Sequence, residues 1–95
     1  MMGRLRICDN KGFHIEFDNG YTVSVQFGGG NYCDNYDFPI GKERDGRGMK
    51  SSNAEVAVLK PDRELMELPE FGDAVAPRQT VAQILEWLNK VAAYP

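Results

Sequence analysis

The residues of this sequence best suited to covalent chemistry are one histidine, His14, and two cysteines, Cys8 and Cys33. A cysteine beside a histidine is the minimum that a thiolate nucleophile needs. The strand pairing that we predict places Cys8 opposite His14, with Glu16 on the same face. That face is polar and flat, and it offers no pocket that would exclude water. We therefore expect no catalytic residue and no enzymatic activity.

The same histidine and cysteines could also bind a metal ion. Their spacing matches no C-x-x-C or H-x-x-x-H pattern, and the predicted face would leave the ion open to water. Acidic and amide side chains between Asn31 and Asp37 resemble a calcium loop in composition, but they lack its regular spacing and its distal glutamate. The sequence therefore predicts no metal site and no cofactor.

A run of three glycines follows a predicted strand and could bind an anion through backbone amides. It does not match a phosphate loop, because Gly41 and Lys42 are followed by Glu43 instead of serine or threonine. A strand exit with a bulge or a close backbone approach explains the run without a ligand. We keep nucleotide or anion binding as the alternative function. Its candidate site consists of Gly28, Gly29, Gly30, Asn31 and Tyr32.

Residues 28–53 form a long segment without hydrophobic periodicity. Connections of this length are generally either functional or disordered. The first part is aromatic enough to pack against something, and we assign Tyr32, Tyr36 and Phe38 as contacts to a protein partner. Residues 41–53 are charged and contain few large apolar residues, so we expect them to be mobile.

The chain has 11 Lys and Arg residues against 14 Asp and Glu residues, and its net charge of −3 argues against binding to nucleic acid. The excess acidity lies mostly within residues 62–73. A solvated hairpin and linker would explain it, and the functional alternative is a patch that steers a basic partner. The acids that we assign to this patch are Glu64, Glu67, Glu70 and Asp73.

Alternating apolar and polar residues predict the strands that must position these groups. The predicted strands lie within residues 4–8, 13–17, 21–27, 54–59 and, as a short fifth strand, 64–68. Three-residue loops between the first three strands gather the large apolar side chains on one face, whereas two-residue turns would divide them between both faces. This rule predicts Phe17 opposite Tyr21 and Asp9 opposite Phe13. The glycines expected in left-handed conformation at these loops are Gly12 and Gly20.

The end of the chain predicts a helix. Thr80 and Gln83 fit a capping box, in which each side chain accepts a hydrogen bond from the backbone amide of the other residue. The predicted apolar stripe consists of Val81, Ile84, Leu85, Leu88, Val91 and Ala92. Trp87 lies on the flank of this stripe, where it could border the core or anchor a partner.

Together these elements predict an α+β fold, with an antiparallel sheet of four to five strands and one C-terminal helix packed on one face. Ninety-five residues make a single domain, 1–95, with one modest core. No apolar run approaches the roughly 18 residues that cross a bilayer, and no secretory leader is recognisable. With two cysteines, the expected state is two reduced thiols in the cytoplasm.

One part of the chain carries a resemblance. The segment Phe13–Asp37, especially the run Asn19–Gly28 followed by Asn31-Tyr32-Cys33, is similar to small, uncharacterised accessory proteins of bacteriophages and prophages. The later segment Ala54–Val58 resembles the same group. The resemblance covers about half of the chain and implies no catalytic or ligand residues. It implies an accessory factor that binds a host protein inside the host cell.

We therefore expect a small, non-enzymatic phage protein that binds and inhibits or modulates a host protein, with a defence complex (an anti-CRISPR-like target) as the expected class. We expect no membrane contact and no nucleic acid partner. Homo-oligomerisation stays open at this point, as does the identity of the host protein.

Overall fold

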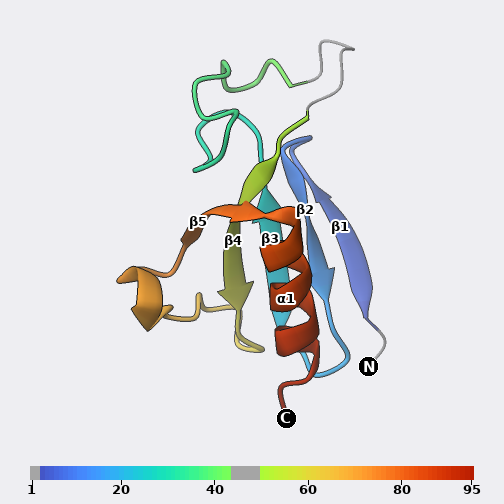
Figure 1. Cartoon of the computed structure of the whole chain (residues 1–95). Helices are drawn as coiled ribbons and strands as arrows, with labels where there is room; N and C mark the ends of the chain where they lie inside the picture. Colours follow the sequence, from blue (N-terminus) through green and yellow to red (C-terminus); the bar gives the residue numbers. More distant parts are fainter. Residues whose placement is uncertain (1–2, 44–49) are drawn as a thin grey trace.

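The computed structural model describes residues 3–43 and 50–95, and it confirms the α+β fold (Figure 1). Five antiparallel strands form one open sheet in the order β1-β2-β3-β4-β5, followed by one helix. In this described part, no helix has the length and apolar character needed to cross a membrane. The elements are β1 (Arg4–Cys8), β2 (Gly12–Glu16), β3 (Thr22–Gln26), β4 (Asn53–Leu59), a 3-10 turn (Pro69–Phe71), β5 (Ala76–Thr80) and α1 (Val81–Ala92).

The hairpin of β2 and β3 has the predicted register. Phe13 lies opposite Val25 and Ile15 lies opposite Val23. The amide of Phe17 donates to the carbonyl of Tyr21 at 2.8 Å, which closes the three-residue loop. Gly20 has a φ of 89°, the left-handed conformation that glycine adopts at little cost. The parity argument therefore correctly placed the apolar residues of both strands on one face.

The hairpin of β1 and β2 is shifted by two residues from our prediction. Cys8 lies opposite Gly12, so the loop is made of residues 9–11. The left-handed residues are Asp9 and Asn10, with φ of 47° and 59°, because aspartate and asparagine tolerate this conformation better than most side chains. The predicted left-handed Gly12 and the pairing of Asp9 with Phe13 are wrong. A shift by two keeps every side chain on its predicted face.

The fifth strand is not the segment that we predicted. Residues 64–68 form only isolated bridges, such as Leu59 with Leu65, and the strand that pairs with β4 is Ala76–Thr80. A register irregularity between Ala54 and Val56 accompanies this pairing. Pro77 is tolerated in β5 because the strand lies at the edge of the sheet. The predicted turn at Pro61 is present, with the amide of Arg63 donating to the carbonyl of Lys60 at 2.8 Å.

The helix starts where predicted and packs against one face of the sheet, running roughly along the direction of β3 and β4 (Figure 1). The Thr80 hydroxyl accepts from the amide of Gln83 at 3.2 Å, and the Gln83 side chain accepts from the amide of Thr80 at 2.8 Å. The core consists of Val23, Val25, Ala54, Val56, Val58, Leu68, Ala76, Trp87 and Val91.

The buried face of α1 is rotated from the predicted stripe. Val81 and Leu85 are exposed, whereas Trp87 is buried and donates its indole N–H to the Gln79 side chain at 2.8 Å. Satisfying this donor lets the indole enter the core. Trp87 is thus a core residue, one of the two roles that the sequence left open for it.

Gly12 tests how closely β2 approaches β3. A Cβ atom at this position would collide with the carbonyl oxygen of Val25 on β3, so Gly12→Ala should push the two strands apart. We expect a loss of about 2 kcal/mol or more in the free energy of unfolding, measured by urea denaturation. Gly20→Ala is the comparison, with an expected cost of about 1 kcal/mol from its positive φ and a tight side-chain contact with Pro61 in place of a backbone collision. A neutral Gly12→Ala would contradict the close approach of β2 to β3.

Candidate functional site

Two of the three predicted aromatic contacts lie together on the surface of the long loop. The rings of Tyr32 and Tyr36 are stacked, with centroids 5.8 Å apart and planes inclined by 4°. Tyr32 is 49% exposed and Tyr36 is 46% exposed, whereas Phe38 is only partly exposed. The amide of Gly30 donates to the carbonyl of Tyr36 at 2.9 Å. This hydrogen bond closes the loop from Gly30 to Tyr36, which carries both rings. We call residues 28–38 the tyrosine loop.

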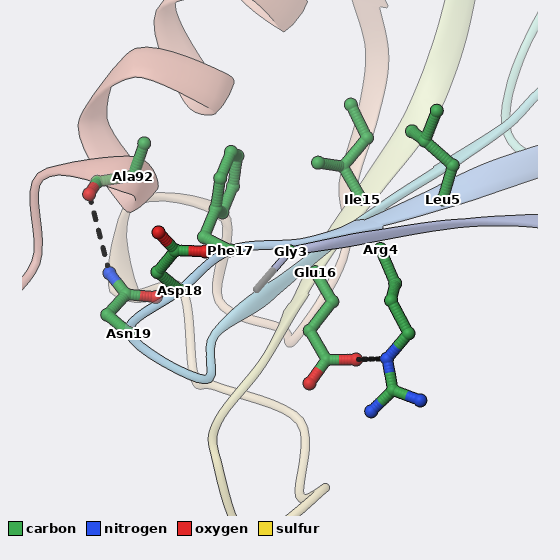
Figure 2. A pocket seen from close by; sticks show the side chains of 9 residues that line it. All are labelled: Gly3, Arg4, Leu5, Ile15, Glu16, Phe17, Asp18, Asn19 and Ala92. Atoms are coloured by element: carbon green, nitrogen blue, oxygen red, sulfur yellow. Dashed lines mark hydrogen bonds and ion pairs between the residues drawn. The ribbon is translucent and has the colours of Figure 1, made fainter. Parts of the chain in front are cut away.

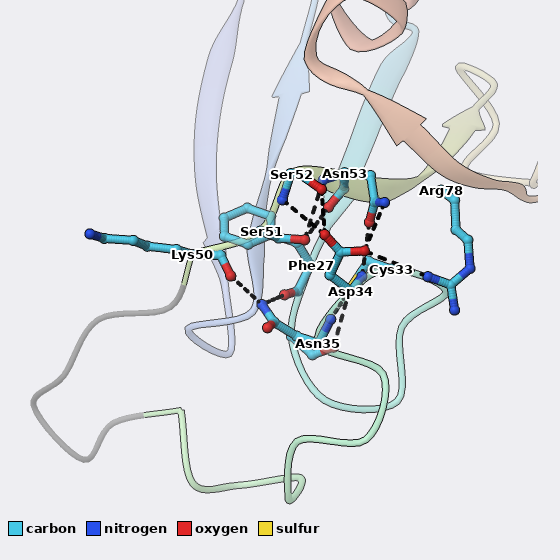
Figure 3. Close-up of polar contacts among 10 residues, drawn as sticks. Phe27, Cys33, Asp34, Asn35, Lys50, Ser51, Ser52, Asn53 and Arg78 are labelled. Carbon is cyan, nitrogen blue, oxygen red and sulfur yellow. Dashed lines mark hydrogen bonds and ion pairs between the residues drawn. The ribbon is translucent and has the colours of Figure 1, made fainter.

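The tyrosine loop is attached to the sheet through Asp34 (Figure 3). The Asp34 carboxylate accepts hydrogen bonds from the Ser52 hydroxyl and, at 3.0 Å, from the Asn53 side chain. The guanidinium of Arg78 on β5 lies 3.8 Å from the same carboxylate. The hydrogen bonds from Ser52 and Asn53 hold the pKa of Asp34 below its usual value. This carboxylate therefore joins the loop to the beginning of β4 and to β5.

Further contacts hold the loop on either side of Asp34. The Asn35 side chain donates to the carbonyls of Phe27 at 2.8 Å and Lys50 at 2.9 Å (Figure 3). The amide of Arg78 donates to the carbonyl of Tyr32 at 2.9 Å. Cys33 is fully buried among these contacts. The backbone of the tyrosine loop is thus held at several points, and the loop carries both tyrosines on its surface.

The glycine run has no amide free for an anion. The amides of Gly28, Gly29 and Tyr32 donate to the side chains of Asn31, Glu43 and Glu55, at 3.1, 3.2 and 2.9 Å. Those of Gly30 and Asn31 donate to backbone carbonyls within the loop. A Cβ atom on Gly29 would collide with the carbonyl oxygen of Phe38, so close backbone approach explains this glycine. A bound anion would have to displace carboxylates that belong to the chain.

Glu43 is one of these carboxylates, and it is almost fully buried. Backbone amides of Glu43 itself, Gly29 and Gly41 hold its pKa below the usual value.

Within the segment 41–53 that we expected to be mobile, residues 44–49 lie outside the described residues. Ser52 and Asn53, near its other end, contact Asp34.

The predicted acidic patch lies apart from the tyrosine loop. Glu64, Glu67, Glu70 and Asp73 are all exposed on the connection between β4 and β5. This connection leaves β4 after Leu59 and returns to the sheet at Ala76, whereas the tyrosine loop contacts β4 at Asn53 and β5 at Arg78. Six residue steps, about 20 Å at 3.3 Å per residue, separate Leu59 from Asn53, whereas Ala76 at the other end of the connection is only two residues from Arg78.

A second surface was missed by sequence reasoning. Leu5 and Ile7 on β1 are 79% and 78% exposed, although they lie on the face of the sheet that carries the helix. Beside them an open groove of about 540 Å³ runs between β1, β2 and the end of α1 (Figure 2). Its apolar lining residues are Leu5, Ile15, Phe17 and Ala92, and polar residues such as Asp18 and Asn19 line it as well. We had expected the helix to cover this whole face. The signal in the sequence was the number of predicted strands, which one helix is too narrow to cover.

The opposite face of β1 and β2 is polar and carries basic side chains. Arg4 pairs with Glu16 at 3.5 Å (Figure 2), and Arg6 lies opposite His14. Arg63 from the turn after β4 lines the same shallow pocket as Arg4 and Arg6. Partial burial, followed by the charges of Arg6 and Arg63, lowers the pKa of His14. The predicted pairing of Cys8 with His14 is wrong, since Cys8 lies opposite Gly12.

The candidate metal ligands are therefore not brought together. Across residues 3–43 and 50–95, no group of three His, Cys, Asp or Glu side chains is arranged to hold a metal ion.

Comparison with known proteins adds no assignment: no protein-family model, no curated protein and no solved structure matches this chain.

Asp34 provides a test of how the tyrosine loop is held. Its lowered pKa means that its stabilising contribution is complete at neutral pH and is lost as the pH falls through that lowered pKa. Asp34→Asn removes the charge at every pH, so amides of the tyrosine loop should exchange hydrogen faster at neutral pH while those of β3 stay protected. Hydrogen exchange followed by NMR measures both. Unchanged exchange in the loop would show that Asp34 does not hold it.

Proposed function

We propose that this chain is a non-enzymatic protein that acts by binding another protein in a stoichiometric complex. The resemblance to phage accessory proteins suggests a host protein as the partner, met in the cytoplasm of the host cell, and a defence complex as its class. The binding site in this proposal is the tyrosine loop, with Tyr32, Tyr36 and the partly exposed Phe38 as anchors. The carrying observation is the stacked, half-exposed pair of tyrosine rings on a held loop.

Physical reasons favour this pair as a protein-binding element. Tyrosine offers a large, rigid contact area at a low cost in conformational entropy, and it is enriched at the centres of protein interfaces. The hydrogen bonds of Asp34 and Asn35 already order the loop, so little further ordering is needed on binding. The alternative, nucleotide or anion binding by the glycine run and the residues after it, has no such support because their amides already donate to acceptors of the chain, among them Glu43 and Glu55.

The tyrosine pair can be tested by substitution. Replacing Tyr32 and Tyr36 together by alanine should weaken the complex by about 2 kcal/mol or more, because two interface anchors are lost. The measurement is affinity capture from lysate of phage-infected bacteria, followed by titration of the purified partner. Tyr32→Phe with Tyr36→Phe is the matched control, because it keeps both rings and should retain most of the affinity. Equal affinity of the alanine variant would contradict the proposal.

The acidic patch should act on the rate of association. Glu64, Glu67 and Glu70 are exposed, so they would attract a basic partner before contact without adding much affinity. Replacing all three by lysine should slow association about tenfold or more at low salt, measured by stopped-flow mixing with the captured partner. The difference should shrink at high salt, where exposed charges are screened. An unchanged rate at low salt would remove the patch from the proposal and leave the tyrosine loop untouched.

A further inference from the structure

The strand β1 forms one outer edge of the sheet, and within the described residues no strand lies beyond it (Figure 1). An edge strand has backbone N–H and C=O groups that point away from the sheet and can pair with another strand. Sheets commonly protect such an edge with charged side chains or with a covering element. Here the helix makes its main contacts with β3, β4 and β5, which leaves β1 uncovered on the helix side.

The side chains of β1 differ sharply between the two faces (Figure 2). Leu5 and Ile7 stand on the helix side, and almost four-fifths of each is exposed. Arg4 and Arg6 stand on the other side, where Arg63 adds a third guanidinium and Glu16 is the one carboxylate lining the same pocket. A strand placed beside β1 would therefore meet apolar side chains on one face and positive charge on the other.

A second copy of this chain does not fit that edge well. In the antiparallel pairing of two β1 strands that overlaps all five residues, Arg6 would lie directly opposite Arg6 of the other copy. Like charges placed opposite each other destabilise strand pairs. The basic face instead complements carboxylates, and the exposed leucine and isoleucine complement apolar residues on the other face.

We propose that the β1 edge accepts an extended segment of a partner protein, with apolar side chains beside Leu5 and Ile7 and acidic side chains beside Arg4 and Arg6. The added segment becomes a sixth strand of the sheet, bound by backbone hydrogen bonds and selected by its alternating side chains. Its apolar residues also border the groove at Leu5 and Phe17. This surface is separate from the tyrosine loop. Strand addition at β1 can therefore be correct even if the tyrosine loop does not bind a partner, and the reverse also holds.

Two synthetic peptides test the proposal without knowledge of the natural partner. One alternates glutamate with isoleucine over at least the five residues of β1, and the other has lysine in place of glutamate. In an NMR titration of the isotope-labelled protein, the acidic peptide should shift the amides of Leu5 and Ile7 and slow their hydrogen exchange. It should bind about fivefold or more tightly than the basic peptide, because cross-strand charge pairs favour it.

The variant Arg6→Glu tests whether the preference for the acidic peptide depends on the positive charge at the β1 edge. This variant should reduce or invert the preference for the acidic peptide, whereas Lys90→Glu, the same charge change on α1, should leave it unchanged. Leu5→Lys should weaken both peptides, and a dispersed NMR spectrum confirms that each variant is folded. The proposal is overturned if neither peptide at about 1 mM shifts β1, if Arg6→Glu leaves the preference unchanged, or if the free protein forms a dimer that Leu5→Lys dissociates.

Discussion

A single helix is too narrow to cover a sheet of five strands, and the exposed surfaces of this protein depend on that limit. A helix with its side chains is about 10 Å wide, whereas five strands spaced about 4.8 Å apart extend over about 19 Å. The helix follows β5 without an intervening loop, because Thr80 both ends the strand and caps the helix. It therefore begins at the β5 side of the sheet. The apolar residues of β1, at the far edge, remain in contact with water.

Contacts at the other end of the helix hold it in this position. The Asn19 side chain, in the loop between β2 and β3, donates to the carbonyls of Val91 at 2.9 Å and Tyr94 at 3.0 Å. The ring of Tyr21 meets that of Tyr94 edge to face, with centroids 5.0 Å apart. Asn19 thus adds a side-chain donor at the end of the helix, where carbonyls lack intrahelical partners and the Val91 carbonyl also accepts from the amide of Tyr94. The same contact forms one end of the groove beside β1, so one asparagine both supports the fold and shapes that surface.

The sequence was informative wherever a structure depends on neighbouring residues. Period-two alternation located four of the five strands, and loop parity correctly set the register of β2 against β3. The capping pair of Thr80 and Gln83 located the start of the helix. The sequence-based prediction was wrong where two segments could adopt the same local structure. Asp9 and Asn10 can turn the chain as well as Gly12 can, and the acidic segment 64–68 alternates like a strand although Ala76–Thr80 occupies the place beside β4.

Local patterns also determined which side chains share a face, because a strand repeats every two residues and a helix every 3.6 wherever it is placed. They could identify the tyrosines and acids as candidates, but not how the two groups lie relative to each other in the fold. Only the packed molecule decided that Trp87 is buried, that Leu5 and Ile7 are uncovered, and that acceptors of the chain itself bind the glycine amides. These outcomes depend on where elements distant in sequence meet. No short run of residues determines these contacts, because they depend on how the whole chain packs together.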